Sequence, residues 1–412
     1  MAANRLKLFE GCGIELEYII ADCETLDVMP VSDEVLRSAA GRYTTDHYNG
    51  SMGWSNELVS HVMEIKNNDP VPSLKGLSKS FHKQITDINK ILSPMGGMLM
   101  PSAMHPWMNP RKETRLWARR YHNVYETYDR IFNCKRHGWA NVQSMHINLS
   151  FKGDDEFGRL HAAVRLLLPM IPALAASSPV VEGKITGLQD TRLLHYAANQ
   201  KKVPSIMGKI IPEPVFTKAE YKEKILGKMY RDIAEYDDEN ILQNEWLNSR
   251  GAIPRYERNA MEIRIADTQE CPRADIAIAE IIISVLKLLV ADEWSGYEEQ
   301  KAWGVNALLP VFKSTIRDSG SAVIENAHYL EMFGFFGKKA TANELWKHLI
   351  TEAGKKAAIS SESLEILRLI TEEGTLSKRI LRSIGRNPSH EKLKTAYKKL
   401  CECLAENRVF IE

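Results

Sequence analysis

Six charged or imidazole side chains stand between apolar residues in four short segments of the chain. They are Glu15, Glu17, Glu64, His146, Glu262 and Arg264. Carboxylates and an imidazole, with few thiolates nearby, suit oxygen-preferring cations such as Mg2+ or Mn2+, and in proteins these ions most often contact nucleotide phosphates. An arginine such as Arg264 binds two oxygens of a phosphate or carboxylate at once. These residue types therefore indicate a metal site for an anionic ligand.

The segments that carry these residues have the pattern of β-strands. Apolar and polar residues alternate in GIELEYII, residues 13–20, and again in SHVMEIKNN, QSMHINLSF and NAMEIRIADTQECP. Since successive side chains on a strand point to opposite faces, Glu15 and Glu17 share a face, roughly 6.6 Å apart. The plainer interpretation is a sheet whose polar faces meet water. Glutamates and a histidine on neighbouring strands would, however, repel or stay unpaired without a cation, which favours the metal site.

His146 has three possible roles at this stage. An imidazole with an ordinary pKa near 6.5 can contact a metal or phosphate, act as a general base, or be a core group satisfied by a neighbour. The first role is the one favoured by the neighbouring strands.

Helical patterns fill much of the remaining chain. Apolar spacing predicts amphipathic or buried helices over residues 73–92, 156–177 and 274–291. Pro169 and Pro172 predict a kink in the second of these.

The C-terminal hundred residues are almost wholly helical in pattern. Cap and stop residues divide them at Ser360, Ser361, Gly374, Gly385 and Pro388. We therefore expect a catalytic domain over residues 1–310 and a helical region over residues 311–412 that packs on it.

Composition excludes several classes of partner. The 54 basic and 53 acidic residues nearly cancel, so the net charge indicates neither nucleic acid nor an anionic membrane as a partner. The longest apolar runs, residues 166–176 and 276–291, are interrupted by proline or charge and predict buried helices instead of membrane spans. The start MAANRLKLFEG lacks the pattern of an export signal, and six scattered cysteines lack metal-site spacing. A cytoplasmic protein with reduced thiols is expected.

The amino-acid sequences of four segments resemble those of a known family. GIELEY, VMEIKNNDP, SMHINLSF and NAMEIRIADTQECP, in this order, resemble the glutamate-cysteine ligase family of ATP-dependent carboxylate-amine ligases. The similarity extends over most of residues 8–290 and includes AMHPWMNP and HGWANVQS. It implies a glutamine-synthetase-like α+β fold, in which a curved, mainly antiparallel sheet forms a funnel with helices outside.

The resemblance also implies roles for individual residues. The expected ligands of two or three Mg2+ or Mn2+ ions are Glu15, Glu17, Glu64, His146 and Glu262. Arg264 and Arg192 are the expected catalytic arginines, and Arg264 and Glu64 are expected to contact ATP. A third arginine of the family corresponds to Arg130 or Arg136, and the sequence does not choose between them.

The activity implied by the resemblance is formation of a γ-glutamyl amide through an acyl phosphate. The substrates would be ATP, glutamate or a related acid, and an amine that the sequence does not identify. Two alternatives stay open: a metal-dependent hydrolase or phosphotransferase that uses the same carboxylates, and a binding or regulatory protein without catalysis. The sequence leaves open whether the chain forms a homo-oligomer.

Overall fold

The fold is built around one antiparallel sheet, seen in a computed structural model that describes residues 6–357 and 359–411. Within these residues the sheet has eight strands in the order β2-β3-β4-β1-β6-β10-β9, and β5 also pairs with β1. The strands are β1 (Cys12–Asp22), β2 (Asp46–Asn49), β3 (Met52–Asn56), β4 (Val62–Asn67), β5 (Gly97–Met100), β6 (Ser144–Ser150), β9 (Ala252–Arg255) and β10 (Ala260–Asp267). All four segments that the alternation marked as strands are therefore strands, and they are neighbours: β4, β1, β6 and β10.

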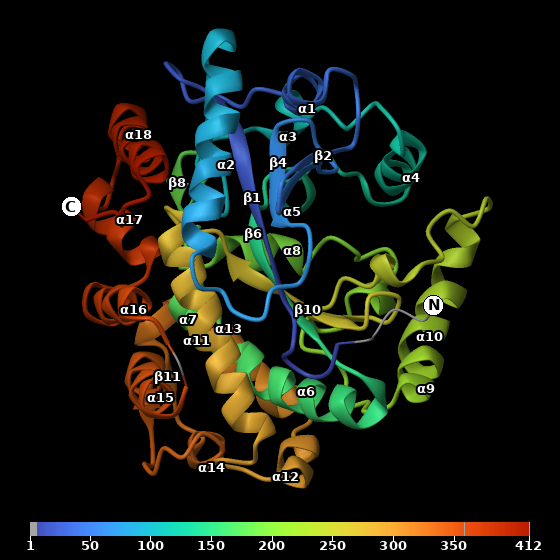
Figure 1. The fold of residues 1–412 in the computed structure, drawn as a ribbon, viewed down its shortest axis with the longest axis vertical. Helices are drawn as coiled ribbons and strands as arrows, with labels where there is room; N and C mark the ends of the chain where they lie inside the picture. Colours follow the sequence, from blue (N-terminus) through green and yellow to red (C-terminus); the bar gives the residue numbers. More distant parts are fainter. Residues whose placement is uncertain (1–5, 358, 412) are drawn as a thin grey trace.

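Helices cover the apolar face of the sheet. Ile14, Leu16 and Tyr18 of β1 are fully buried there. They belong to one hydrophobic core with side chains of α2 (Leu77–Leu92), α6 (Gly153–Leu167) and α11 (Pro272–Val290). Figure 1 shows α2 and α11 lying across this face. Burying the apolar face in this way leaves the opposite face of β1 to its carboxylates.

The three predicted helices are present, with small differences at their ends. The first begins at Leu77 and not at residue 73, because Gly76 precedes it with a left-handed backbone, φ 81°. The kink at the prolines is confirmed: α6 ends at Leu167, a 3-10 turn covers Leu168–Met170, and α7 covers Pro172–Ala175. Proline removes a backbone donor and clashes with the preceding turn, so the helix axis changes there.

The described part of the last hundred residues is mainly helical. It contains α13 (Val305–Asp318), α14 (Ala327–Glu331), α15 (Ala342–Lys356), α16 (Ser361–Glu373), α17 (Leu376–Ile384) and α18 (His390–Glu406). Ser360 caps α16, and Gly374 and Gly385 end α16 and α17, as predicted. A two-stranded sheet of β11 (Val323–Ile324) and β12 (Ala340–Thr341) was not predicted, since each strand has only two residues.

The C-terminal helices contact the remainder of the chain. α15 and α16 pack against α11, and α18 packs against α2 and β5. The proposed division at residue 310 stays a prediction, and Pro310 itself lies inside α13.

Two further observations concern the class of protein. Among the described residues, no helix combines the length and apolar character needed to cross a bilayer. All six cysteines are free thiols. The expectation about an export signal rests partly on residues 1–5, which lie outside the described part of the chain.

Candidate active site

A cavity of about 340 Å³ lies against the polar face of the four neighbouring strands. It is lined by every residue to which the sequence assigned a definite role: Glu15, Glu17, Glu64, His146, Arg192, Glu262 and Arg264. Strand register brings the distant segments together, because β1 pairs Glu17 with Glu64 of β4 and Glu15 with His146 of β6. Side chains opposite one another on the same face of adjacent strands lie close enough to interact.

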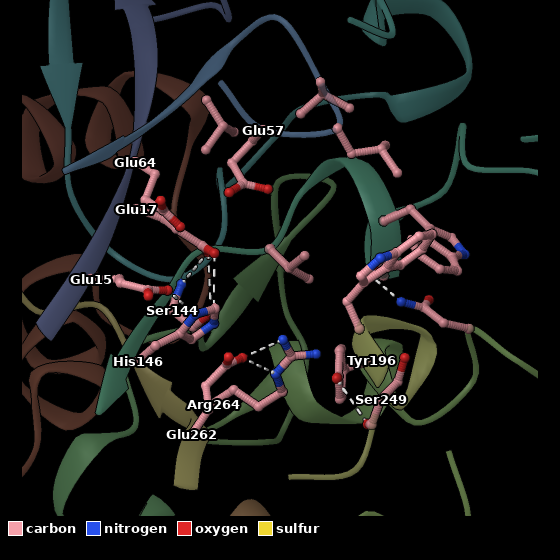
Figure 2. A pocket seen from close by; sticks show the side chains of 18 of the residues that line it. Glu15, Glu17, Glu57, Glu64, Ser144, His146, Tyr196, Ser249, Glu262 and Arg264 are labelled. Carbon is pink, nitrogen blue, oxygen red and sulfur yellow. Dashed lines mark hydrogen bonds and ion pairs between the residues drawn. The ribbon is translucent and has the colours of Figure 1, made fainter. Parts of the chain in front are cut away.

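His146 lies between the two carboxylates of β1 (Figure 2). Its Nδ1 is 2.9 Å from Oε2 of Glu15, and its Nε2 is 3.7 Å from Oε1 of Glu17. The backbone amide of Ser144 donates to Oε2 of Glu17 at 2.7 Å. These contacts fix Glu15, Glu17 and His146 in one cluster.

Burial and neighbouring charges act in opposite directions on the pKa values of the cluster. Burial lowers the pKa of His146, but the hydrogen bond to Glu15 and the charges of Glu17 and Glu15 raise it above its ordinary value. Burial raises the pKa of Glu17 against the opposing charge of His146. The pKa of Glu64 is lowered, because the ammonium of Lys66, 2.7 Å away, overcomes the effect of burial.

Glu57 is a member of this cluster that sequence reasoning missed. It follows β3 in a loop and projects into the cavity beside Glu17 and Glu64 (Figure 2). Burial, together with the charges of Glu17 and Glu64, raises the pKa of Glu57 well above its ordinary value. No ion pair or hydrogen bond of its carboxylate occurs within the described residues. A lone glutamate in a loop has no periodic signal that could have revealed it.

The donor atoms fit divalent cations. One group consists of Glu15, Glu64 and His146, and a second consists of Glu17, Glu57 and Glu64; in each, the possible ligand atoms lie within 4.8 Å of one another. Carboxylate oxygens with one imidazole are the ligands that Mg2+ and Mn2+ accept, and one glutamate can bridge two ions. The two groups share Glu64, so the cluster fits a pair of neighbouring ions.

Glu262 is held by arginines in this structure. Its Oε1 accepts from Arg264 at 2.5 Å, and its Oε2 accepts from Arg255 at 2.9 Å. The charge of Arg264 overcomes burial and lowers the pKa of Glu262 to about 2. Glu262 belongs to neither group of candidate ligands, so its role as a metal ligand stays a prediction.

Arg192 enters the cavity from α8 (Thr191–Tyr196) and is almost completely buried. Its Nε donates to Asp267 at 2.5 Å, while its Nη2 is buried without a hydrogen-bond partner among the described residues. Asp267, the last residue of β10, therefore positions this guanidinium, and one of its donors stays available.

Neither candidate for the third arginine lines the cavity. Arg130 is exposed on α4 (His122–Phe132). Arg136 lies in a neighbouring pocket with His137 and His195. The choice between Arg130 and Arg136 therefore remains open.

Five aromatic residues also line the cavity. We call this set the aromatic side: Tyr125, Tyr128, Trp139, Tyr196 and Trp246. They come from α4, α5 (His137–Ala140), α8 and the 3-10 turn Glu245–Leu247. Ring centroids of Tyr128 and Trp139 are 5.3 Å apart, and those of Tyr128 and Trp246 are 6.0 Å apart. Sequence reasoning missed this set because aromatic residues at helical spacing ordinarily indicate core packing.

A second cavity, of about 580 Å³, adjoins the first. The two share Glu15, Lys66 and Arg258. Glycines 11 and 13 and several asparagines contribute to its lining. The two cavities therefore form a continuous groove along the polar face of the sheet.

Comparison with known sequences identifies relatives over most of the chain. A family model described as glutamate-cysteine ligase family 2 matches residues 12–399. An uncharacterized protein from Archaeoglobus fulgidus is 32% identical over 399 residues, which is 97% of this chain and 100% of the relative.

Two solved structures share the fold. A glutamate–cysteine ligase from Francisella tularensis in complex with AMP superposes with a TM-score of 0.58 at 12% identity, over 95% of this chain and 88% of that one. A bifunctional glutathione synthetase from Pasteurella multocida gives 0.55 at 11% identity, over 96% of this chain and 52% of that one. The expected α+β fold, with a mainly antiparallel sheet and outer helices, is confirmed.

Proposed function

The chain belongs to glutamate-cysteine ligase family 2, a family of C–N ligases, and we propose that it uses ATP to join glutamate or a related acid to an amine. A carboxylate is a poor acyl donor, because its oxygen is a poor leaving group. Transfer of the γ-phosphoryl group of ATP to that oxygen gives an acyl phosphate, while the bond between Pγ and the bridging oxygen breaks and ADP leaves with the electron pair. The amine nitrogen, with one proton removed from its ammonium form, then attacks the acyl carbon. The C–N bond forms, the C–O bond to phosphate breaks, and phosphate leaves with the electron pair while the nitrogen loses a second proton.

The carboxylate cluster would serve the phosphates. Bringing an anionic acid to a triphosphate is electrostatically unfavourable. Divalent cations held by Glu15, Glu64 and His146, and by Glu17 and Glu57 with Glu64, would neutralise the phosphate oxygens. Except for Glu57, these side chains stand on strands of the sheet, which would keep them in place with little reorganisation.

The arginines would orient the reacting groups. Arg264 lies between the carboxylate cluster and Tyr196 (Figure 2), a position suited to the transferring phosphoryl group or to the acid. Its salt bridge to Glu262 fixes the plane of the guanidinium. The unpartnered Nη2 of Arg192 is a further donor for the acid or for charge that develops during transfer.

The nucleotide would extend into the second cavity. Lys66 and Arg258 line both cavities beside Glu15, so a triphosphate at this junction meets two cations and the candidate metal ligands. The base and ribose would then lie in the second cavity, whose lining includes Gly11 and Gly13.

One observation supports this proposal most directly: two groups of metal-compatible ligands share Glu64 and face Arg264 across the same cavity. That arrangement combines phosphate neutralisation with an anion-orienting group, which a carboxylate-activating enzyme requires. A hydrolase or phosphotransferase would use the same carboxylates, and the experiment below separates the two.

An ADP-release assay tests the proposal. Purified protein is incubated with ATP and Mg2+, with glutamate and a panel of amines present singly and together, and products are identified by mass spectrometry. We expect sustained ADP release only when both an acid and an amine are present, with formation of an amide. Equal release of phosphate from ATP without either substrate would overturn the ligase assignment in favour of hydrolysis.

A further inference from the structure

The aromatic side of the cavity is where an amine substrate would lie. In the proposed reaction, the phosphates occupy the carboxylate cluster and the acid lies near Arg264. Tyr196 and Ser249 lie across Arg264 from Glu15, Glu17 and Glu64 (Figure 2). The aromatic side is therefore the part of the lining from which an amine would attack the acyl phosphate.

Most basic side chains of the cavity already pair with acids, and the unpartnered Nη2 of Arg192 is the donor proposed for the acid substrate. Among the described residues of the lining, the basic side chains are Lys66, Arg192, Arg255, Arg258 and Arg264. Four of these pair with buried acids: Lys66 with Glu64, Arg192 with Asp267, and Arg255 and Arg264 with Glu262. The fifth, Arg258, is exposed in the turn between β9 and β10, at the junction with the second cavity.

Arg264 is the cation that the aromatic side meets. Its charge lowers the pKa of Tyr128, although burial, the larger effect, raises that pKa overall. A glutamate substrate brings a carboxylate that uses this guanidinium. An amino acid as the second substrate would bring another carboxylate, for which the aromatic side offers no cation.

On its other flank, the aromatic side also meets no basic side chain of the described cavity lining. The amide of Asn56 donates to the hydroxyl of Tyr125 at 3.1 Å, and the neighbouring residue is Glu57, whose charge, second to burial, raises the pKa of Tyr125. A carboxylate placed among these rings would be desolvated without a basic side chain beside it. Burial of an unpaired charge is strongly unfavourable.

The rings of the aromatic side favour a substrate that has an apolar body and an ammonium group. The ring faces of Tyr128, Trp139 and Trp246 supply apolar area and an attraction for cations. The indole Nε1 of Trp139 is buried without a partner among the described residues. One neutral donor can bind a hydroxyl or carbonyl oxygen on a substrate, but it does not offset a full negative charge.

We propose that the amine substrate is a primary amine with an apolar or aromatic body and without a carboxylate of its own. This inference rests on the proposed ligase function and narrows its acceptor class. The inferred class of amine substrate excludes cysteine and other amino acids, because each carries a carboxylate.

Matched pairs of amines that differ by one carboxylate test the inference. Phenethylamine is compared with phenylalanine, and cysteamine with cysteine, in the glutamate-dependent ADP-release assay. For each pair we expect kcat/KM to be at least about 100-fold higher for the amine, the size of effect that an uncompensated buried charge produces. Equal or faster turnover with the amino acids would overturn the inference while leaving the ligase function intact.

Binding measured without turnover makes the two proposals separable. Tryptophan fluorescence and calorimetry are recorded with phenethylamine and phenylalanine, in the presence of a non-hydrolysable ATP analogue, Mg2+ and glutamate. We expect phenethylamine to bind and phenylalanine to bind at least about tenfold more weakly. If ADP release fails with every acid and amine but this difference in binding is found, the ligase function is wrong and the assigned ligand class stands. Equal binding of the two compounds would overturn the assigned class.

Two variants localise the effect. Trp246→Leu removes one ring of the aromatic side and should weaken phenethylamine binding, whereas Trp294→Leu, outside the cavity, should not. Val142→Lys adds a cation to the cavity lining and should narrow the difference between phenethylamine and phenylalanine. Unchanged binding in both Trp246→Leu and Val142→Lys would contradict the location.

Discussion

The carboxylate of Glu15 has neighbours that hold it whether or not it carries charge. His146 Nδ1 is 2.9 Å from one oxygen, and Asn148 donates to the other at 3.1 Å. Glu15→Gln preserves the volume of the side chain and can keep one of these hydrogen bonds, but removes an anionic metal ligand. We expect ADP release under ligase conditions to fall at least about 100-fold, because metal neutralisation of the phosphates is worth several kcal/mol.

The fold should survive this substitution. Circular dichroism and the thermal midpoint should match those of the parent protein, and the exposed substitution Glu298→Gln should leave ADP release unchanged. Equal ADP release by Glu15→Gln and the parent would show that Glu15 holds no catalytic metal.

Six of the cavity residues could be predicted from sequence because they follow the two-residue period of strands. Glu15 and His146 stand between apolar residues, and this alternation predicts that both side chains lie on the polar face of the sheet. Glu57 and the aromatic side have no such signal. Their places depend on how a loop and several helices pack against the sheet, which is set by contacts between distant segments.

At the scale of elements, local sequence predicted the kinks and ends of single helices but not which strands are neighbours in the sheet. Prolines at 169 and 172 and the cap at Ser360 act on their own helix, so kink and boundary could be read directly. The order of strands in the sheet could not, because β1 pairs with β4, β5 and β6 across very different sequence separations. Only the family resemblance supplied the expectation of an antiparallel sheet.

The contact between α5 and α8 forms one wall of the cavity and depends on Gly138. A Cβ at this position would lie 2.0 Å from Oδ1 of Asn199 and 2.5 Å from the backbone oxygen of His195. Gly138→Ala must therefore displace α5, which also carries Trp139. We expect a loss of about 1–3 kcal/mol in the free energy of unfolding, measured with urea, as for other overpacked sites.

Gly304→Ala is the matched control, because a Cβ at Gly304 meets nothing within 4 Å. It should change the free energy of unfolding by less than Gly138→Ala does. Comparable stability of Gly138→Ala and the parent would mean that α5 can shift freely against α8.

At the scale of the whole molecule, a buried ion pair joins the C-terminal helices to the sheet. Arg379 of α17 donates to Glu270, which follows β10, at 2.6 Å, and also to the backbone oxygen of Phe410. The amide of Phe410 donates to the same oxygen of Glu270 at 3.2 Å. Helix α17, the end of β10 and the C-terminal segment thus meet at one pair of charges.

Arg379→Met leaves the carboxylate of Glu270 buried without its cation. We expect a loss of about 3–5 kcal/mol in the free energy of unfolding, the usual result of removing one member of a buried pair. The exposed neighbour Lys378→Met should have little effect, and adding Glu270→Gln to Arg379→Met should recover part of the loss. Stability within error of the parent would show that the pair does not join the two parts.

Three fully buried histidines make the stability of the whole chain depend on pH. Burial lowers the pKa of His61 and His105 to about 4 and that of His161 to about 3. An unfolded histidine titrates near 6.5, so between pH 6.5 and 4 the unfolded chain binds protons that the native chain excludes. Each histidine therefore contributes stability above pH 6.5 that is lost as the pH falls through this window.

His161 gives the cleanest measurement of this effect, because its Nδ1 bonds to the carbonyl of Val215 and its Nε2 has no partner among the described residues. His161→Gln lowers stability at pH 7 but removes one titrating group. Between pH 6.5 and 5 the parent should lose about 1.6 kcal/mol more than the variant, because the unfolded histidine goes from half to almost fully protonated while the native one stays neutral. Urea unfolding at both pH values measures the difference, with the exposed substitution His122→Gln as control. Equal losses in parent and His161→Gln would mean that His161 is protonated in the native protein.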